Sequence, residues 1–225
     1  QQVAELRRLE QPAIVSLCAP GSPTGASVPA QRLFEMAAAF PQTIFVVDQS
    51  WLPLSDAHAD LDRLQPENVL CIRSISLQCA LPGLRAGYAL GSPTLLARIA
   101  AARPPFLSSA PALAALQATM LATEPALSSR HQLQADRARL CTLLDALGLV
   151  HTPSVAPFVL VRVARAAEVS EELRSAHGIA VFDATPFGLP DHLRISAVRA
   201  QHAPQLRAAL EHVLERRKLV RGRET

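Results

Sequence analysis

Side chains that can bind charged ligands stand at the ends of several short apolar segments. Asp48 lies near the end of TIFVVDQ, and Trp51 follows it closely. Ser74 ends NVLCIRS, and Arg85 directly precedes AGYALG. Arginine and hydroxyl groups suit a phosphate, whereas a buried carboxylate suits a protonated ring nitrogen. With an aromatic ring beside them, these groups predict a site for a phosphorylated, cationic heteroaromatic ligand.

The segments that carry these residues have the patterns of buried strands. Four short apolar runs predict strands at 13–20, 43–49, 68–74 and 86–91. Helical spacing of apolar residues predicts helices at 28–40 and 92–102. In an open α/β sheet, ligands bind beyond the carboxyl ends of the strands. We therefore expect Asp48, Ser74 and Arg85 to lie at that edge of one sheet.

The second half of the chain predicts long helices and fewer strands. The helices are expected at 111–121, 128–147, 166–178 and 203–217, and the strands at 158–163, 179–182 and 192–198. Strands that alternate with helices predict an α/β fold with a mainly parallel sheet. We expect a partial large domain at 1–125, followed by a smaller C-terminal α/β domain at 126–225.

Composition narrows the class of protein. The chain has 225 residues, of which 49% are hydrophobic and 18% are charged, a profile typical of globular proteins. No apolar run has the length of a membrane span, and the beginning of the sequence lacks the order of a secretory signal. The four cysteines form no C-x-x-C pair, and the histidines lack metal-ligand spacing. We expect a cytoplasmic protein with buried free thiols and neither a metal site nor a membrane partner.

The positive charge is concentrated at the C-terminal end. Residues 216–225 contain five basic groups and one acid, which leaves 17 basic and 18 acidic residues elsewhere. Such a segment can contact nucleic acid or an anionic surface. Cations at the end of a helix also complement the helix dipole. The second interpretation is favoured because no aromatic residues alternate with the charges, and no nucleic-acid partner is expected.

Five ordered motifs resemble those of one enzyme family. CAPGSPTG, VVDQSW, RSISLQCALPGLRAG, ARPPFLSSAPALAALQA and HLRISAV are similar to successive motifs of the class I/II aminotransferases of pyridoxal-phosphate fold type I, especially the histidinol-phosphate group. The spacing also agrees, with 26 residues from Ser22 to Asp48, 29 from Asp48 to Leu77 and 8 from Leu77 to Arg85. The resemblance implies pyridoxal phosphate as cofactor, a homodimer and a small amino-acid-like ligand.

The same resemblance implies a role for each matching residue. Asp48 would pair with the pyridine nitrogen of the cofactor, and Ser74 and Arg85 would hold its phosphate. Arg194 would bind the substrate carboxylate. Trp51 stands where the family has a tyrosine that contacts the phenolic oxygen of the cofactor. Ser22 replaces an asparagine that contacts the same oxygen.

Leu77 is the decisive departure from the family pattern. In the family, this position is the lysine that binds the cofactor covalently and moves a proton during the reaction. Leucine has neither a nucleophile nor a titratable group. The only lysine of the sequence is Lys218, beyond the predicted helices that carry the motifs. The isolated chain is therefore predicted not to transaminate.

Three hypotheses remain from the sequence. The chain is an aminotransferase-family domain that has lost catalysis, a pseudoenzyme that retains at most non-covalent binding of pyridoxal phosphate or an amino acid. Alternatively, it is an active transaminase in which another group or a partner chain supplies the missing lysine. In the third hypothesis it is a non-catalytic interaction module that dimerises. The missing lysine argues most strongly against the second hypothesis.

Overall fold

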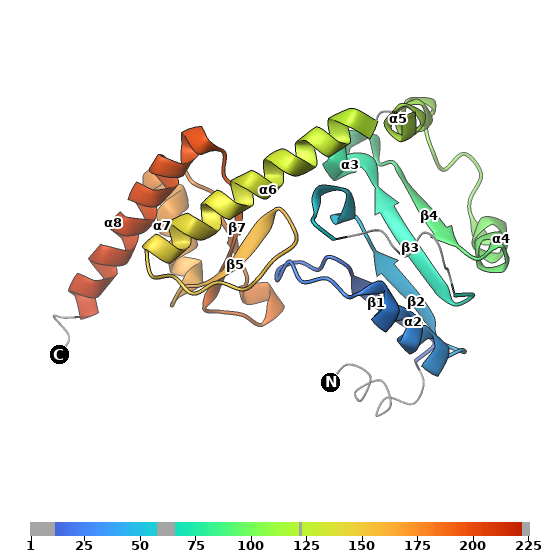
Figure 1. The fold of residues 1–225 in the computed structure, drawn as a ribbon, viewed down its shortest axis with the longest axis horizontal. Helices are drawn as coiled ribbons and strands as arrows, with labels where there is room; N and C mark the ends of the chain where they lie inside the picture. Colours follow the sequence, from blue (N-terminus) through green and yellow to red (C-terminus); the bar gives the residue numbers. More distant parts are fainter. Residues whose placement is uncertain (1–11, 58–65, 122, 222–225) are drawn as a thin grey trace. The chain divides into compact units, whose positions relative to one another are not determined.

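The computed structural model describes residues 12–57, 66–121 and 123–221. The chain divides into two compact units (Figure 1). Unit 1 comprises residues 1–21 and 26–130, and unit 2 comprises residues 22–25 and 131–225. Each unit has its own sheet and is described by itself.

Unit 1 is built on a four-stranded sheet. Its strands are ordered β1 (Ile14–Cys18), β2 (Ile44–Asp48), β3 (Val69–Ser74) and β4 (Gly87–Gly91). The first three strands are parallel, and β4 runs antiparallel to β3. The helices of the unit are α2 (Ala30–Ala39), the short α3 (Ile75–Gln78), α4 (Pro93–Ala102) and α5 (Ala110–Leu121). Every strand predicted for this half of the chain is present, and the sheet is mainly parallel as predicted.

One side chain fastens α2 to the sheet. The Nδ2 atom of Asn68 donates to the carbonyl oxygens of Ala37, Phe40 and Thr43 at 3.0, 3.0 and 2.9 Å. Ala37 and Phe40 belong to a buried cluster that also contains Phe45 and other apolar residues of α2, β2 and β3. Asn68 therefore joins the end of α2 to the residue before β2, and it supplements the N–H of Thr43, which also donates to the carbonyl oxygen of Phe40.

Unit 2 has a smaller, antiparallel sheet. Its strands lie in the order β5 (Phe158–Arg162), β7 (His192–Ser196) and β6 (Phe182–Asp183). The helices are α7 (Ala166–His177), α8 (Ala203–Arg221) and the C-terminal part of α6 (Thr123–Ala146). Leu144, Val161, Leu173, Leu193 and Leu210, all fully buried, belong to one core that draws on these elements.

Three expectations require correction. The strand predicted at 179–182 is confined to Phe182–Asp183, because residues 179–181 are held by α7. Cys18 is exposed, although buried thiols were predicted at all four cysteines. The strand β1 is not covered on both faces, since its residues alternate between exposed and partly buried, and Ile14 is 60% exposed.

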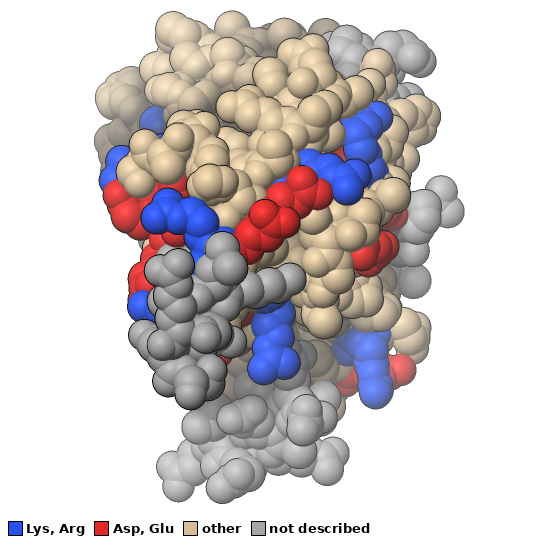
Figure 2. Space-filling view, turned by 90° about the vertical axis from the view of Figure 1, so that its left-hand side faces the viewer, with Lys and Arg blue, Asp and Glu red and all other residues tan. Residues whose placement is uncertain are grey.

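Ion pairs on unit 2 join residues of opposite charge. Arg174 pairs with Glu171, Arg207 pairs with Glu211, and Arg216 of α8 reaches Glu172 of α7 at 3.2 Å. Figure 2 shows acidic and basic side chains interspersed on the face that it presents. Arg216, the first residue of the predicted basic segment, is thus engaged within the unit. The other side chains of that segment lie outside the described residues.

Candidate functional site

The predicted cofactor residues of unit 1 follow from its strand order. Asp48 ends β2 and Ser74 ends β3, and these two strands are parallel neighbours. Gly87, the first residue of β4, pairs with Ser74, so Arg85 lies near the same edge. Parallel pairing of β2 and β3 and antiparallel pairing of β4 therefore bring Asp48, Ser74 and Arg85 to one edge of the sheet, as the spacing predicts.

Asp48 is half-buried and fixed by the turn that follows it. Its Oδ1 atom accepts the backbone N–H of Ser50 at 2.8 Å, and its carbonyl oxygen accepts the N–H of Ala19 at 2.9 Å. A carboxylate retains further acceptor positions after one such bond. Cys18 lies opposite Asp48 in the register of β1 and β2. Burial and, to a smaller extent, the Asp48 carboxylate raise the pKa of the Cys18 thiol.

Leu77 lies on α3, a helix of four residues that Ser74 caps. The Oγ atom of Ser74 accepts the N–H of Ser76 at 3.1 Å, so the hydroxyl proton of Ser74 stays available to a ligand. The Leu77 side chain is 40% exposed. The position to which the resemblance assigns the lysine is therefore accessible, and an apolar side chain occupies it.

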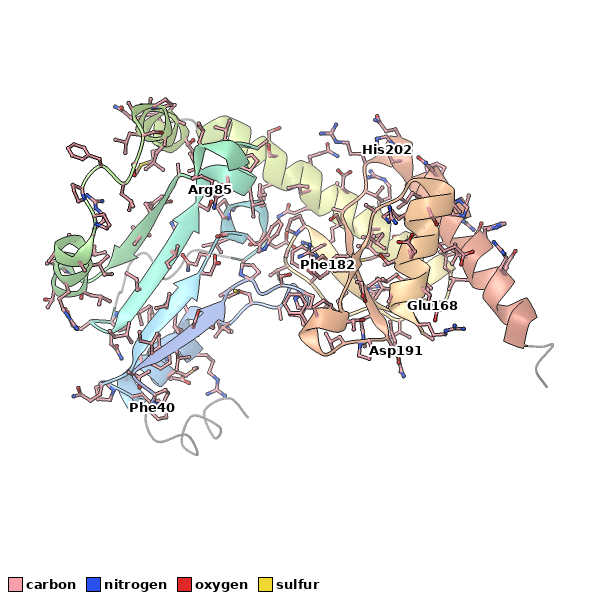
Figure 3. All side chains as sticks on the ribbon, turned by 180° about the vertical axis from the view of Figure 1, so that it is seen from behind. Phe40, Arg85, Glu168, Phe182, Asp191 and His202 are labelled. Carbon is pink, nitrogen blue, oxygen red and sulfur yellow. The ribbon has the colours of Figure 1, made fainter. Side chains whose placement is uncertain are left out.

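Arg85 is exposed and has an unusual backbone conformation. It ends the 3-10 turn Pro82–Leu84 with φ 51° and ψ 47°, in the left-handed region. One guanidinium nitrogen, Nη1, donates to the carbonyl oxygen of Pro82 at 3.1 Å. Figure 3 shows Arg85 near α3, on the side of the sheet where β3 ends. Its remaining N–H groups can bind a phosphate, the role that the resemblance implies.

The sequence reasoning missed a polar contact beside this site. The Nε atom of Arg73 donates to Oε1 of Gln49 at 2.9 Å, and Gln49 is only 1% exposed. The bond links the ends of β2 and β3, next to Asp48 and Ser74. Gln49 follows Asp48 and Arg73 precedes Ser74, so their positions in the sequence already indicated that they lie beside the site. Trp51, half-buried, directly precedes a 3-10 turn at Leu52–Leu54.

Arg194 of unit 2 is surrounded by aromatic rings. Its guanidinium carbon lies 4.9 Å from the ring centre of Phe158 and 4.6 Å from that of Phe182. The Nη1 atom donates to the Oγ atom of Ser22 at 2.6 Å. Among the described residues, the buried Nε atom has no hydrogen-bond partner. Burial lowers the pKa of Arg194.

Ser22 reaches Arg194 because residues 22–25 pack within unit 2. The carbonyl oxygen of Gly25 accepts the N–H of Val155 at 3.0 Å. Gly25 has φ +70°, and a Cβ atom added there would lie 1.9 Å from Oγ of Ser154. Only glycine readily adopts this left-handed conformation and also leaves room for the Ser154 side chain. Ser22 and Arg194, assigned to different ligands by the resemblance, are thus hydrogen-bonded neighbours.

The described part of the chain contains no cluster of three or more potential metal-ligating side chains. None of its helices is both long enough and apolar enough to cross a bilayer.

Comparison with known proteins identifies the family. The family described as aminotransferase class I and II matches residues 2–213. The chain belongs to this family. Histidinol-phosphate aminotransferase 1 of Nitrosococcus oceani is 32% identical over 214 residues, which are 91% of this chain and 57% of the relative. The enzyme of the same name from Rhodospirillum centenum is 34% identical over 83% of this chain and 54% of its own length.

Solved structures support the same assignment. Histidinol-phosphate aminotransferase from Sinorhizobium meliloti, in complex with pyridoxal-5′-phosphate, has a TM-score of 0.83 and 28% identity, over 95% of this chain and 60% of that one. L-threonine-O-3-phosphate decarboxylase from Porphyromonas gingivalis has a TM-score of 0.78 and 26% identity, over 90% and 64%. This aminotransferase-family chain therefore spans just over half the length of the curated relatives it matches.

The residues of unit 1 fit pyridoxal phosphate only in part. The Asp48 carboxylate suits a protonated pyridine nitrogen, and the Ser74 hydroxyl and Arg85 guanidinium suit a phosphate. The aldehyde of the cofactor requires an amine, and Leu77 offers none. The arrangement is thus compatible with the charges of the cofactor but not with its covalent attachment.

Proposed function

We propose that this chain is an aminotransferase-family domain that has lost covalent attachment of pyridoxal phosphate and does not transaminate. The observation that carries the proposal is Leu77, an apolar side chain at the accessible position of the family's lysine. By ancestry, the reaction transfers an amino group between an amino acid or amino-phosphate and a 2-oxo acid. The named relatives favour a substrate of the histidinol-phosphate type.

Each remaining residue has a role that does not need the lysine. Bound pyridoxal phosphate would supply an electron-accepting ring, and Asp48 would keep the nitrogen of that ring protonated. Ser74 and Arg85 would hold its phosphate by hydrogen bonds. Arg194 would bind a carboxylate through guanidinium N–H groups that the Ser22 hydroxyl does not use. Binding and orientation are therefore retained in this proposal, whereas the nucleophile and proton shuttle are lost.

The test is a titration of the purified chain with pyridoxal phosphate, followed by visible absorbance, borohydride reduction and intact mass. Three versions are compared: the unchanged chain, Leu77→Lys and the matched control Leu77→Arg, which adds length and charge without a nucleophilic amine. Leu77→Lys and Leu77→Arg also carry Lys218→Arg, so that in these two versions residue 77 is the only site that can supply a lysine. Peptide mapping separates a reduced adduct at residue 77 from one at the terminal amine.

The proposal predicts a reduced adduct at residue 77 in Leu77→Lys and none in the other two versions. That result would show that the unchanged chain lacks only its covalent anchor. An adduct with transaminase activity in the unchanged chain, alone or mixed with a partner, would refute the proposal and favour a completed active enzyme. If Leu77→Lys is folded but binds no cofactor, the retained binding role of Asp48, Ser74 and Arg85 is wrong.

A second function, self-association, is favoured by an apolar surface of unit 1. Ala112 is the only buried residue of α5 within the described chain. Large apolar side chains on α5 and in the loop before it are exposed: Phe106 (101%), Leu107 (65%), Leu113 (54%), Met120 (65%) and Leu121 (79%). Contiguous exposed apolar residues mark interaction surfaces. We propose that two copies of the chain associate through this α5 surface as a homodimer.

Light scattering after size exclusion tests the association. The unchanged chain should have the mass of a dimer, and Leu113→Glu should shift it to a monomer because a charge would be buried at the interface. Val150→Glu is the matched control, since Val150 is also an exposed apolar residue (71%) but lies in unit 2. A monomeric unchanged chain, or equal effects of the two substitutions, would refute the α5 surface as the interface.

A further inference from the structure

Two exposed aromatic rings lie beside Arg194 in unit 2. Phe182, one of the two rings that contact its guanidinium group, is 38% exposed. Phe187 lies against Phe182, with ring centres 5.8 Å apart and ring planes inclined at 52°, and it is 51% exposed. Phe158, the other ring at the guanidinium group, is only 1% exposed. Phe182 therefore connects Arg194 to an aromatic surface that solvent reaches.

The strand register places Arg194 and Phe182 on one face of the sheet of unit 2. Phe182 of β6 pairs with Arg194 of β7, and residues that are paired across antiparallel strands carry their side chains on the same face. Leu193 and Ile195, which flank Arg194 in β7, point to the other face and belong to the buried core that includes residues of α7 and α8. Arg194 and Phe182 thus lie on the face opposite that core, and Figure 3 shows Phe182 beside the strands of this unit.

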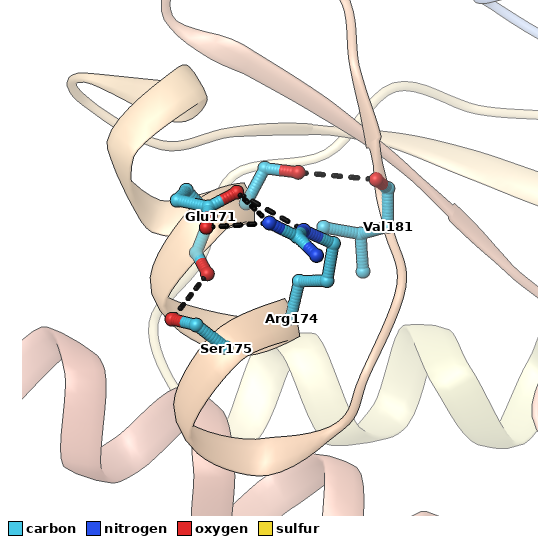
Figure 4. Close-up of polar contacts among 5 residues, drawn as sticks. Glu171, Arg174, Ser175 and Val181 are labelled. Atoms are coloured by element: carbon cyan, nitrogen blue, oxygen red, sulfur yellow. Dashed lines mark hydrogen bonds and ion pairs between the residues drawn. The ribbon is translucent and has the colours of Figure 1, made fainter.

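The backbone at Phe182 is held by two elements. Phe182 and the following Asp183 pair with β7. In addition, the hydroxyl of Ser170 in α7 donates to the carbonyl oxygen of Val181, the residue directly before Phe182, at 3.1 Å (Figure 4). The exposed ring of Phe182 therefore projects from a fixed backbone position beside Arg194.

Phe187 is carried by a short turn that has its own hydrogen bonds. The 3-10 turn Thr185–Phe187 follows β6, and the Oδ1 atom of Asp183 accepts both the N–H and the hydroxyl of Thr185, at 3.1 and 2.8 Å. The N–H of Phe187 donates to the carbonyl oxygen of the fully buried Ala184 at 2.9 Å. The two rings are thus presented by fixed backbone beside a charged group. Aromatic side chains with a few placed polar groups are typical of small-molecule sites.

Arg194 supplies the polar part of this surface. The Ser22 hydroxyl accepts one N–H of Nη1, so the remaining N–H groups of the Nη atoms can donate to a ligand. A guanidinium group is well matched to a carboxylate. The rings of Phe182 and Phe187 can pack against another aromatic ring, whereas they offer no hydrogen-bond donor to a phosphate. The surface therefore suits a ligand that joins a carboxylate to an aromatic ring.

We propose that Phe182 and Phe187 select a substrate with an aromatic side chain, either an aromatic α-amino acid or the corresponding 2-oxo acid. In such a molecule a single methylene joins the ring to the α-carbon, so a carboxylate on Arg194 leaves the ring within reach of the two phenylalanines. The inference rests on the carboxylate-binding role proposed for Arg194, and it favours an amino acid over an amino-phosphate as substrate. All of the groups that it uses belong to unit 2.

The test titrates the full chain with L-phenylalanine, L-alanine and O-phospho-L-serine, and it follows binding through backbone amide shifts. L-alanine has the same carboxylate without a ring, and O-phospho-L-serine carries a phosphate in place of the ring. Phe187→Ala removes the more exposed ring of the pair. Val150→Ala is the control, because Val150 is an exposed apolar residue (71%) of the same unit. Arg194→Met removes the donor to the carboxylate.

L-phenylalanine should bind about tenfold more tightly than L-alanine, the factor for an aromatic contact of this kind, with shifts centred on Phe182, Phe187 and Arg194. Phe187→Ala should reduce the affinity for L-phenylalanine towards that for L-alanine, and Val150→Ala should not.

Two groups of results would overturn the inference, and they have different meanings. Equal binding of L-phenylalanine and L-alanine, tighter binding of O-phospho-L-serine, or equal effects of Phe187→Ala and Val150→Ala would refute the aromatic preference alone. The carboxylate-binding role of Arg194 would then stand. No binding of any of the three compounds, or binding of L-phenylalanine that Arg194→Met leaves unchanged, would refute that role and the inference with it.

Discussion

The contact between Ser22 and Arg194 supports a quantitative prediction about unit 2. The guanidinium gains two cation–π contacts, of about 1 kcal/mol each, and a hydrogen bond of about 1.5 kcal/mol. Against this, the buried Nε atom lacks a partner among the described residues, at a cost of about 1–3 kcal/mol. The net contribution of the charged group is therefore only about 0.5–2.5 kcal/mol, although its contacts are close.

A double-mutant cycle separates these effects. Ser22→Ala alone should destabilise unit 2 by about 1.5 kcal/mol, because it leaves a second guanidinium nitrogen without its acceptor. Arg194→Met should cost only about 0.5–2.5 kcal/mol, because it removes the buried polar group together with its contacts. In the Arg194→Met background, Ser22→Ala should cost less than about 0.5 kcal/mol, since there is no donor left to lose.

Hydrogen exchange of the β5 and β7 amides, with urea unfolding followed by circular dichroism, measures this cycle. Fluorescence is unsuitable, because Trp51 and Tyr88, the only Trp and Tyr of the chain, both lie in unit 1. Ser22→Thr, which keeps the hydroxyl, is the control for the backbone position. If Ser22→Ala destabilised the Arg194→Met protein as much as the unchanged chain, the two residues would be uncoupled and the reasoning would fail.

Two further predictions concern unit 1. Asn68→Ala should lower the free energy of unfolding of unit 1 by about 2–3 kcal/mol, because three carbonyl oxygens lose the Asn68 donor. Trp51 fluorescence during urea unfolding measures this free energy. A decrease of less than about 0.5 kcal/mol would contradict the role of Asn68 in joining α2 to the sheet. Asp48→Asn should speed alkylation of Cys18 near pH 8. Burial is the larger cause of the raised pKa of the Cys18 thiol, and the Asp48 carboxylate is the smaller one. Removing the carboxylate should therefore lower this pKa and increase the thiolate fraction. Peptide mapping measures the rate at each cysteine, and Cys141 serves as internal reference. An unchanged rate at Cys18 would contradict the influence of the Asp48 side chain on this thiol.

The elements of this chain were predictable because their signals are local. Apolar runs predicted the strands of unit 1. The serine cap and the proline at the start of α4 are present in the structure, where Ser92 accepts the N–H of Leu95 and Pro93 is the first helical residue. The convergence of Asp48 and Ser74 was predictable for a different reason, because both end strands that pair in parallel. Arg85 precedes β4 and reaches the same edge only because β4 runs antiparallel to β3, a direction that the sequence does not indicate.

The features that were missed depend on contacts between distant parts of the sequence. The Ser22–Arg194 bond joins residues 172 positions apart, and no local pattern indicates that residues 22–25 pack with unit 2. The shortened β6 has a similar cause. Its sequence is apolar enough for a longer strand, but Ser170 and Leu173 of α7 compete for the backbone that would pair with β7. Sequence periodicity cannot show which of two hydrogen-bonding partners is chosen.

The geometry around Leu77 shows that the side chain at this position can be exchanged while the fold persists. The short helix α3 is fixed by the Ser74 cap, by the buried Ile75 and by the pairing of Ser74 with Gly87, none of which involves the side chain at position 77. A side chain that is 40% exposed there contributes little to packing. Lysine and leucine are therefore nearly equivalent for stability at this position, but they differ completely as nucleophiles. It follows that Leu77→Lys should fold as well as the unchanged chain, so its cofactor chemistry reports on the site rather than on stability.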